Sequence, residues 1–185
     1  MPAGSLDFWQ ARLADTGVAT QRDASRFGDD VLRFDDPSGL WFELIAGADD
    51  PRAPWTGRDV DAAHAIRGLH SVAMTVRALG PTRELMTDLL GYVVTAEAGN
   101  RMRLTAGGAA PGHIIDILEE PAAAPAVNGL GTVHHVAMAT ATPGEQLALR
   151  EDLLARGVSV TEVRDRSYFQ SIYFREPGGV LFEIA

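Results

Sequence analysis

A gapless internal repeat constrains this chain more than any other feature of its sequence. Residues 5–45 align with residues 145–185 at a constant offset of 140 positions. The match is densest where FDDPSGLWFEL, residues 34–44, falls on FREPGGVLFEI, residues 174–184. Self-similarity of this kind indicates one supersecondary unit that is used more than once and that buries its apolar face against a neighbour. The sequence therefore predicts a fold built from repeated units.

Each copy predicts the same order of elements, a helix followed by three strands. Apolar residues recur at helical spacing over 5–16 and 143–156, and a glycine, Gly17 or Gly157, follows where helices often end. Short strands are predicted next, at 18–20 and 158–161. Two further strands in each copy meet at the turns Asp-Pro-Ser-Gly and Glu-Pro-Gly-Gly. The later copy has one more strand, residues 131–140, before its helix.

A third unit lies between the two copies. Its first strand, GLHSVAMTV at residues 68–76, is similar to TVHHVAMAT at residues 132–140. A helix is predicted over 81–90, and strands over 92–95, 101–105 and 113–118. The chain thus divides into an incomplete βαβββ unit without its first strand (1–46), a linker (47–66), a complete unit (67–120), an Ala/Pro/Gly-rich second linker (121–131) and a complete last unit (131–185).

Composition excludes several classes of function. The net charge of −9 makes nucleic acid a poor partner, because phosphate binding needs a basic surface. No polybasic run suggests a membrane surface, no stretch approaches the about 20 apolar residues that span a bilayer, and residues 1–7 do not resemble a signal peptide. The absence of cysteine excludes disulfides, thiolate nucleophiles and cysteine-ligated metals. We therefore expect a cytoplasmic protein with no nucleic-acid or membrane partner.

The segments SLDFWQARL, AIRGLHSVAM, GTVHHVAM and SIYFREPGGVLFEIA resemble the hydroquinone-type ring-cleaving dioxygenases. These belong to the vicinal oxygen chelate superfamily, which includes glyoxalase I, bleomycin-resistance proteins and extradiol dioxygenases. The resemblance implies an α+β fold, in which tandem βαβββ units form cupped mixed sheets with helices outside. Members of the subgroup contain four units, and this chain would correspond to the end of the second, the third and the fourth. One interpretation is a truncated form.

The resemblance also implies a mononuclear Fe(II) site, with Mn(II) as the alternative metal. Non-haem iron oxygenases use two histidines and one carboxylate and leave positions open for substrate and O2. The matching ligands in this sequence are His135 and Glu183. His134 and Tyr173 match positions that manage protons, and Arg166 matches one that offsets negative charge. The implied substrates are O2 and a small hydroquinone- or catechol-like aromatic.

The third metal ligand is not evident. Side chains alternate along a strand, so His134 and His135 are expected to point to opposite faces of the strand at 131–140. In the third unit Ser71 aligns with His135, while His70 aligns with His134 and is expected to face away from a metal. In the resembling enzymes the remaining histidine comes from the first unit. A second chain could supply it, the chain could be half of a split enzyme, or activity could have been lost.

Several other polar residues are expected to be structural. Glu43 occupies the position of Glu183 in the first copy, but its unit has no matching histidine. Arg26 aligns with Arg166, so a salt bridge common to both copies is the alternative role for Arg166. His64 and His113 belong to no recognisable constellation.

Two other functions suit the same fold. A glyoxalase-like metal-dependent lyase or isomerase would use Ni(II) or Zn(II) and a second carboxylate, for which Glu43 and Asp116 are the candidates. A non-catalytic protein that binds an aromatic ligand between its units would need no metal. Because such units commonly pair to close a cupped sheet, a unit without a partner predicts a homodimer.

Overall fold

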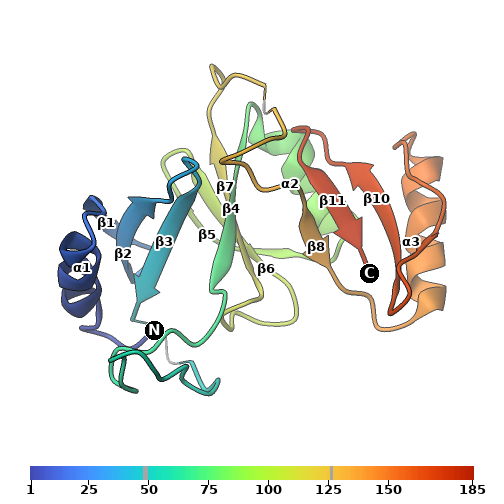
Figure 1. The fold of residues 1–185 in the computed structure, drawn as a ribbon. Helices are drawn as coiled ribbons and strands as arrows, with labels where there is room; N and C mark the ends of the chain where they lie inside the picture. Colours follow the sequence, from blue (N-terminus) through green and yellow to red (C-terminus); the bar gives the residue numbers. More distant parts are fainter. Residues whose placement is uncertain (48–49, 126) are drawn as a thin grey trace. The chain divides into compact units, whose positions relative to one another are not determined.

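The computed structural model describes residues 1–47, 50–125 and 127–185 (Figure 1). Residues 48 and 49 of the first predicted linker and residue 126 of the second lie outside the described residues. The described part forms two compact units. The N-terminal unit comprises residues 1–71, 108–114 and 129–132, and the C-terminal unit comprises residues 72–107, 115–128 and 133–185. Within the described part, no helix is long and apolar enough to cross a membrane.

The N-terminal unit contains one helix and a three-stranded antiparallel sheet of order β1-β2-β3. Its elements are α1 (Leu6–Asp15), β1 (Thr20–Arg26), β2 (Asp29–Asp35) and β3 (Trp41–Ala46). The core of this unit includes Leu6, Leu32 and Ala46. The turn between β2 and β3 is closed by Asp36, whose Oδ1 accepts hydrogen bonds from the backbone N–H groups of Ser38 and Leu40. The first strand begins at Thr20, where the sequence predicted that it would end.

The first sheet of the C-terminal unit has the order β4-β7-β6-β5. Its elements are β4 (Ser71–Val76), α2 (Leu79–Asp88), β5 (Val93–Ala98), β6 (Arg101–Thr105) and β7 (Ile114–Glu119). Helix α2 begins two residues before the predicted start at Pro81. Proline is tolerated there because the N–H groups of a first helical turn have no partner within the helix.

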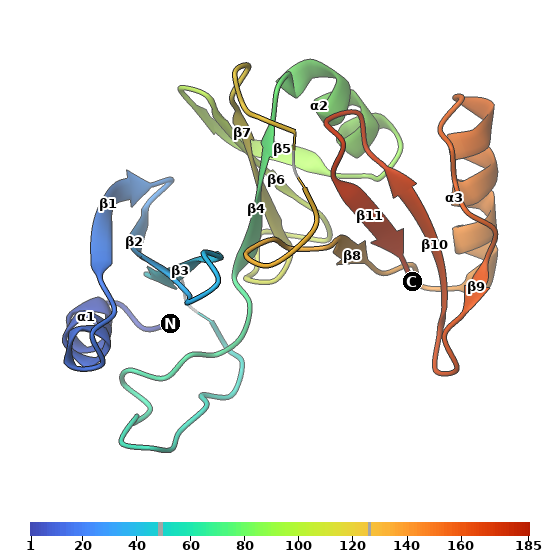
Figure 2. The same cartoon turned by 45° about the horizontal axis from the view of Figure 1, so that its top comes forward.

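The second sheet of the C-terminal unit has the order β8-β11-β10-β9. Its elements are β8 (Val136–Met138), α3 (Pro143–Ala155), β9 (Arg164–Asp165), β10 (Gln170–Arg175) and β11 (Leu181–Ile184). Strands β8 and β11 are parallel and the other pairs antiparallel. Helix α3 lies beside β10 (Figure 2) and begins at the capping residue Thr142, whose Oγ1 accepts from the backbone N–H of Glu145. Helices with antiparallel and mixed sheets confirm the α+β fold class.

The two faces of this second sheet differ in character. Glu183 on β11 pairs with Ala137 on β8 and with Tyr173 on β10. Cross-strand partners project to the same face, so these three side chains lie together on one face. The opposite face carries the buried apolar side chains that join both sheets in one core, among them Val136, Ile172, Phe174, Phe182 and Ile184. Apolar burial on one face therefore positions Glu183 and Tyr173 on the other.

Glu176 connects helix α2 to the turn between β10 and β11. Its carboxylate is buried and accepts hydrogen bonds from Thr82 Oγ1 at 2.7 Å and from the backbone N–H groups of Gly178 and Val180, each at 2.8 Å. Thr82 is itself fully buried on α2. A buried charge needs all of its hydrogen bonds, so Thr82 contributes to the stability of this unit.

Replacing Thr82 with valine should therefore lower the free energy of unfolding by about 1–3 kcal/mol, because the Glu176 carboxylate loses a buried donor. Urea denaturation followed by circular dichroism measures the change. Thr87 on the same helix is the control, because it is only half-buried and its hydroxyl donates to the backbone carbonyl of Arg83 rather than to a buried carboxylate. Thr87→Val should stay within about 0.5 kcal/mol of the unsubstituted protein. Equal effects of the two substitutions would contradict the role given to Thr82.

Candidate metal centre

Four of the five site residues predicted from the sequence form one chain of contacts in the C-terminal unit. His135 Nε2 lies 2.7 Å from Glu183 Oε2. The Tyr173 hydroxyl donates to the other oxygen, Glu183 Oε1, at 2.5 Å, and Arg166 Nη2 donates to the Tyr173 hydroxyl at 3.0 Å. The Glu183 side chain is only 6% exposed, and that of His135 is 33% exposed. The carboxylate is thus almost withdrawn from solvent, while the imidazole beside it remains accessible.

His134 joins the same group by a route that the sequence did not predict. Its Nδ1 lies 2.8 Å from Nδ1 of His135. Both histidines precede β8 and are not part of a regular strand, so the expectation that they point to opposite faces was wrong. Strand alternation applies only where the backbone is extended and paired. One of the two Nδ1 atoms must donate and the other accept, which couples the tautomers of the two rings.

The donor set of His135 and Glu183 fits a first-row divalent ion. Imidazole nitrogen and carboxylate oxygen both suit iron and manganese. Two donors that each lie about 2.1 Å from one ion stand at most about 4.2 Å apart. The observed 2.7 Å between His135 Nε2 and Glu183 Oε2 lies within that limit. Among the described residues, no group of three or more His, Cys, Asp or Glu side chains could hold a metal. The described residues therefore offer two candidate ligands, His135 and Glu183, where the sequence analysis expects three.

Both carboxylates considered for a lyase are occupied by arginines. Arg26 donates to both oxygens of Glu43, at 2.6 and 2.7 Å, which agrees with the structural role expected for Glu43. Arg103 donates to both oxygens of Asp116, at 2.7 and 3.0 Å, and Arg101 lies 3.5 Å from the same carboxylate. Neither carboxylate is therefore open to a metal as the structure stands.

The remaining histidines lie in local contacts of the N-terminal unit. His64 stacks on Phe8 and its Nδ1 lies 2.7 Å from Asp61 Oδ1. His70 Nδ1 lies 3.0 Å from Ser71 Oγ. The backbone N–H of His113 donates to Ala110 O in a turn. His64 and Asp61 lie side by side, but among the described residues no third His, Cys, Asp or Glu side chain joins them to hold a metal.

Two residues that the sequence analysis did not single out help to hold Tyr173. The Arg164 guanidinium lies 5.8 Å from the centre of the Tyr173 ring, and Arg166 lies 5.2 Å from it. Thr161 Oγ1 accepts from the backbone N–H of Tyr173 at 3.0 Å. Arg164 lies in the two-residue strand β9, while Arg166 follows that strand, so alternation along a strand would not have paired the two arginines. The role of Thr161 depends on the position of the chain after α3 and had no signal in the sequence.

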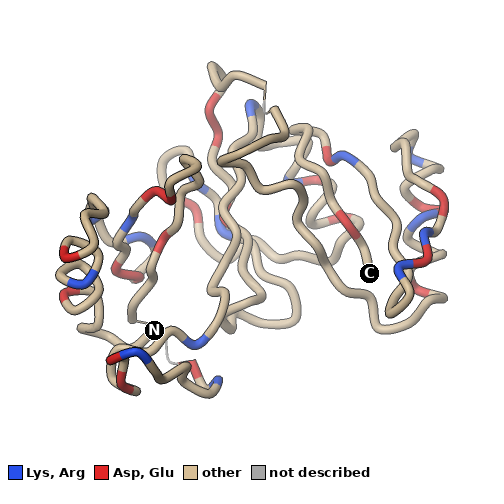
Figure 3. The backbone as a smooth tube through the Cα atoms, viewed as in Figure 1, with Lys and Arg blue, Asp and Glu red and all other residues tan. Residues whose placement is uncertain are grey.

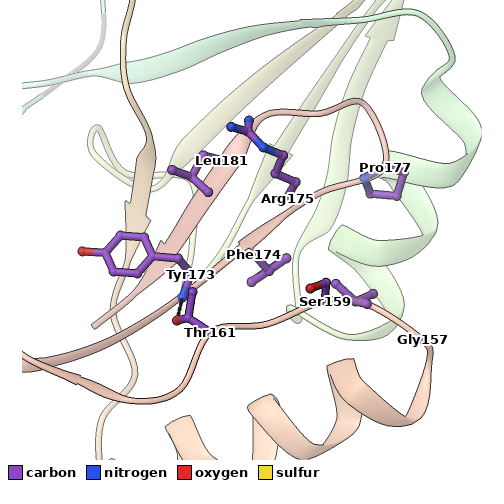
Figure 4. Close-up of a pocket in the computed structure, with 9 residues that line it drawn as sticks. Gly157, Ser159, Thr161, Tyr173, Phe174, Arg175, Pro177 and Leu181 are labelled. Carbon is purple, nitrogen blue, oxygen red and sulfur yellow. Dashed lines mark hydrogen bonds between the residues drawn. The ribbon is translucent and has the colours of Figure 1, made fainter. Parts of the chain in front are cut away.

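An open pocket of about 520 Å³ adjoins Tyr173. Figure 4 shows Tyr173 and Thr161 at one end of this pocket and Pro177 at the other, with Arg175 and Leu181 along one side. Arg175 and Leu181 are cross-strand partners, as are Tyr173 and Glu183 two residues further along. The pocket therefore shares Tyr173 with the candidate centre, while Phe174 from the core face also lines it.

Comparison with known proteins shows which family this chain resembles. The family model of the Glyoxalase/Bleomycin resistance protein/Dioxygenase superfamily matches residues 68–184. A Bacillus subtilis protein named "Putative ring-cleaving dioxygenase MhqE" is 37% identical over 185 residues, covering 100% of this chain and 60% of that protein. The chlorohydroquinone/hydroquinone 1,2-dioxygenase of Sphingobium indicum is 33% identical over 189 residues, covering 98% of this chain and 58% of that enzyme.

A solved structure extends the match to three dimensions. The crystal structure of a putative dioxygenase from Bacillus subtilis superimposes with a TM-score of 0.88 at 34% identity, covering 100% of this chain and 58% of that one. The chain spans about three fifths of the length of the curated relatives it matches. A glyoxalase/dioxygenase from Nostoc punctiforme, at 17% identity and a TM-score of 0.57, shares the fold. The resemblance drawn from the sequence is confirmed, and the chain belongs to the glyoxalase/bleomycin resistance protein/dioxygenase superfamily.

Proposed function

We propose that this chain carries the metal-binding face of a ring-cleaving dioxygenase that acts on a hydroquinone- or catechol-like aromatic with O2. The observation that carries the proposal is the continuous set of contacts from His135 through Glu183 and Tyr173 to Arg166. The names of the relatives, which include a hydroquinone 1,2-dioxygenase, support the same chemistry. The proposal concerns an activity of the whole enzyme, of which this chain provides the residues described above.

In this proposal His135 Nε2 and Glu183 hold Fe(II), with Mn(II) as the alternative metal. The metal supplies the activation of O2, which acids and bases alone do not provide. For Nε2 of His135 to bind a metal, its proton must stand on Nδ1. That Nδ1–H then donates to Nδ1 of His134, 2.8 Å away, which places the proton of a neutral His134 on Nε2. His134 can therefore orient His135 and hold a proton at the edge of the site.

Tyr173 and Arg166 act on the substrate side of the centre. The Tyr173 hydroxyl donates to Glu183 and accepts from Arg166, so its orientation is defined from both sides. Arg166 brings a permanent positive charge to the same point, where it would stabilise a substrate hydroxyl that has lost its proton. The pocket beside Tyr173, with Leu181 and Thr161 in its lining, offers space for an aromatic ring.

The other two functions have weaker support. A glyoxalase-like lyase needs a second free carboxylate, and both candidates, Glu43 and Asp116, are bound by arginines. A non-catalytic aromatic-binding protein would not need His135 and Glu183 to converge on one point.

Anaerobic loading with Fe(II), followed by desalting, tests the proposal. We expect an assembly that supplies the third ligand to retain near-stoichiometric iron and then to consume O2 when a hydroquinone or catechol is added. Protein loaded with Zn(II) or Ni(II) is the control and should consume none. Turnover with Ni(II) and no O2 uptake would favour the lyase. Substrate binding that a chelator does not change, without retained iron, would favour the non-catalytic binder.

A cytoplasmic homodimer completes the proposal. The chain contains no cysteine, which suits a reducing compartment. Light scattering coupled to size-exclusion chromatography would decide the oligomeric state, and a clean monomer would remove the homodimer from the proposal.

A further inference from the structure

Glu43, Asp116 and Glu183 each lie on the strand that comes last along the chain in its sheet. Two of these three carboxylates bind an arginine in the same way. Glu43 on β3 receives two hydrogen bonds from Arg26, one to each oxygen. Asp116 on β7 receives two from Arg103, again one to each oxygen. Bidentate arginine–carboxylate pairs are among the strongest charge-assisted contacts in proteins. In both of these sheets, the arginine beside the carboxylate therefore binds both of its oxygens.

Glu183 on β11 is different although an arginine is nearby. Arg166 aligns with Arg26 at the repeat offset, as Glu183 aligns with Glu43. Arg166 nevertheless donates to the Tyr173 hydroxyl at 3.0 Å, and that hydroxyl donates to Glu183 at 2.5 Å. The tyrosine hydroxyl thus stands between the guanidinium and the carboxylate.

The first copy has a different residue at the position of Tyr173. By the same offset Arg33 aligns with Tyr173, and its guanidinium turns to Gln21 Oε1 at 3.0 Å and to the Trp41 ring at 4.5 Å. Nothing from position 33 is interposed between Arg26 and Glu43, which lie 2.6 Å apart. The two copies therefore carry equivalent arginine–carboxylate pairs. Only in the second copy does a side chain, that of Tyr173, lie between the two as a spacer.

The Tyr173 side chain is well suited to act as a spacer. The tyrosine side chain has only two rotatable bonds that position its ring, and the ring itself is rigid. Thr161 fixes its backbone, while the guanidinium groups of Arg164 and Arg166 flank its ring. Arg166 Nη2 and Glu183 Oε1 lie at most about 5.5 Å apart, because hydrogen bonds of 3.0 and 2.5 Å join them through the Tyr173 hydroxyl. Arginine side chains are long and flexible enough to close that gap.

We propose that Tyr173 is a positioning residue that holds Arg166 away from Glu183 and so keeps the carboxylate available to a metal. This inference rests on the proposed function to the extent that Glu183 is a metal ligand. It differs from a role in proton transfer, because it predicts an effect on metal affinity that depends on the charge at position 166.

Anaerobic Fe(II) titration of the full chain and of three variants tests the inference. Tyr173→Ala should bind Fe(II) about tenfold more weakly or worse, since Arg166 then forms a charge-assisted pair with Glu183. Arg166→Gln alone should bind at least as tightly as the unsubstituted chain. The double variant Tyr173→Ala/Arg166→Gln should recover the affinity of Arg166→Gln, because no cation remains to occupy the carboxylate. Tyr173→Ala/Arg164→Gln is the matched control and should stay weak.

The outcomes separate the inference from the function on which it rests. If the unsubstituted chain binds no Fe(II), the proposed function and the inference fail together. If it binds Fe(II) and Tyr173→Ala binds equally well, or if Arg166→Gln does not rescue the alanine variant, only the inference fails. Tyr173→Ser replaces the alanine variant if thermal unfolding shows that alanine prevents folding. A crystal structure of Tyr173→Ala or Tyr173→Ser in which Arg166 does not contact Glu183 would also overturn the inference.

Discussion

Glu183→Gln is expected to lose retained Fe(II) and with it O2 consumption. The amide has almost the same shape as the carboxylate and can still accept from the Tyr173 hydroxyl, which now lies 2.5 Å away. It lacks the negative charge that a hard divalent ion prefers in an oxygen ligand. Loss of a direct ligand should weaken binding by more than about 100-fold, the upper end of what changes to outer-shell partners cost. Iron per chain after anaerobic desalting measures the effect.

The internal repeat supplies a matched control for this substitution. Glu43 is the repeat equivalent of Glu183 but is bound on both oxygens by Arg26. Glu43→Gln removes the same charge at the same strand position, so general effects on folding or net charge are reproduced. This variant should retain iron as the unsubstituted chain does. Equal iron loss in both variants, or equal retention, would exclude Glu183 as the specific ligand.

The repeat predicted the hairpin of β10 and β11, and the family resemblance supplied the candidate residues that stand on it. The turn Glu-Pro-Gly-Gly places β10 and β11 in antiparallel register, with Tyr173 opposite Glu183. Phe174 and Phe182, their neighbours in sequence, are buried. Side chains alternate along a strand, so burial of Phe174 and Phe182 on one face places Tyr173 and Glu183 together on the other face.

The environment of the histidines could not be predicted in the same way. The pattern around His134 and His135 suggested a strand over 131–140, but β8 contains only Val136–Met138. A strand needs a hydrogen-bonding partner, and the register with β11 provides one only for those three residues. Pairing of this kind is a tertiary property that strand propensity does not determine. The contact between the two rings therefore follows from irregular backbone that the sequence pattern does not describe.

The role of Arg166 was open for a related reason. The sequence allowed either a salt bridge like that of Arg26 or a position beside the substrate. Which of the two roles Arg166 has depends on whether the Tyr173 hydroxyl lies between Arg166 and Glu183. Only the positions of the side chains in the folded protein show this. Repeat alignment identifies equivalent positions but not the side chain that separates two of them. Comparison of the copies becomes informative once their contacts are known.

The largest effect on stability is expected at Asp116, outside the candidate centre. Its carboxylate is 1% exposed and holds Arg103 by two hydrogen bonds, while Arg101 lies 3.5 Å away. Asp116→Ala removes the buried carboxylate that the two guanidinium groups share. Removing one member of a buried pair costs about 3–5 kcal/mol, because the remaining charge is uncompensated. For a chain of this length, each kcal/mol corresponds to roughly 2–4 °C in Tm.

Differential scanning calorimetry measures the change, and an exposed ion pair in the same unit gives the contrast. Arg83 and Glu97 lie 3.1 Å apart with side chains 51% and 54% exposed. Glu97→Ala should therefore cost no more than about 1 kcal/mol, since water screens such a pair. The double variant Asp116→Ala/Arg103→Met should recover part of the loss, because an apolar side chain removes one of the stranded charges. If Asp116→Ala and Glu97→Ala shift Tm equally, burial does not govern the strength of these pairs. The Arg103–Asp116 pair would then contribute no more to stability than an exposed ion pair. Glu183 would differ from Glu43 and Asp116 only in the positions of its neighbouring side chains, not in the strength of its contacts.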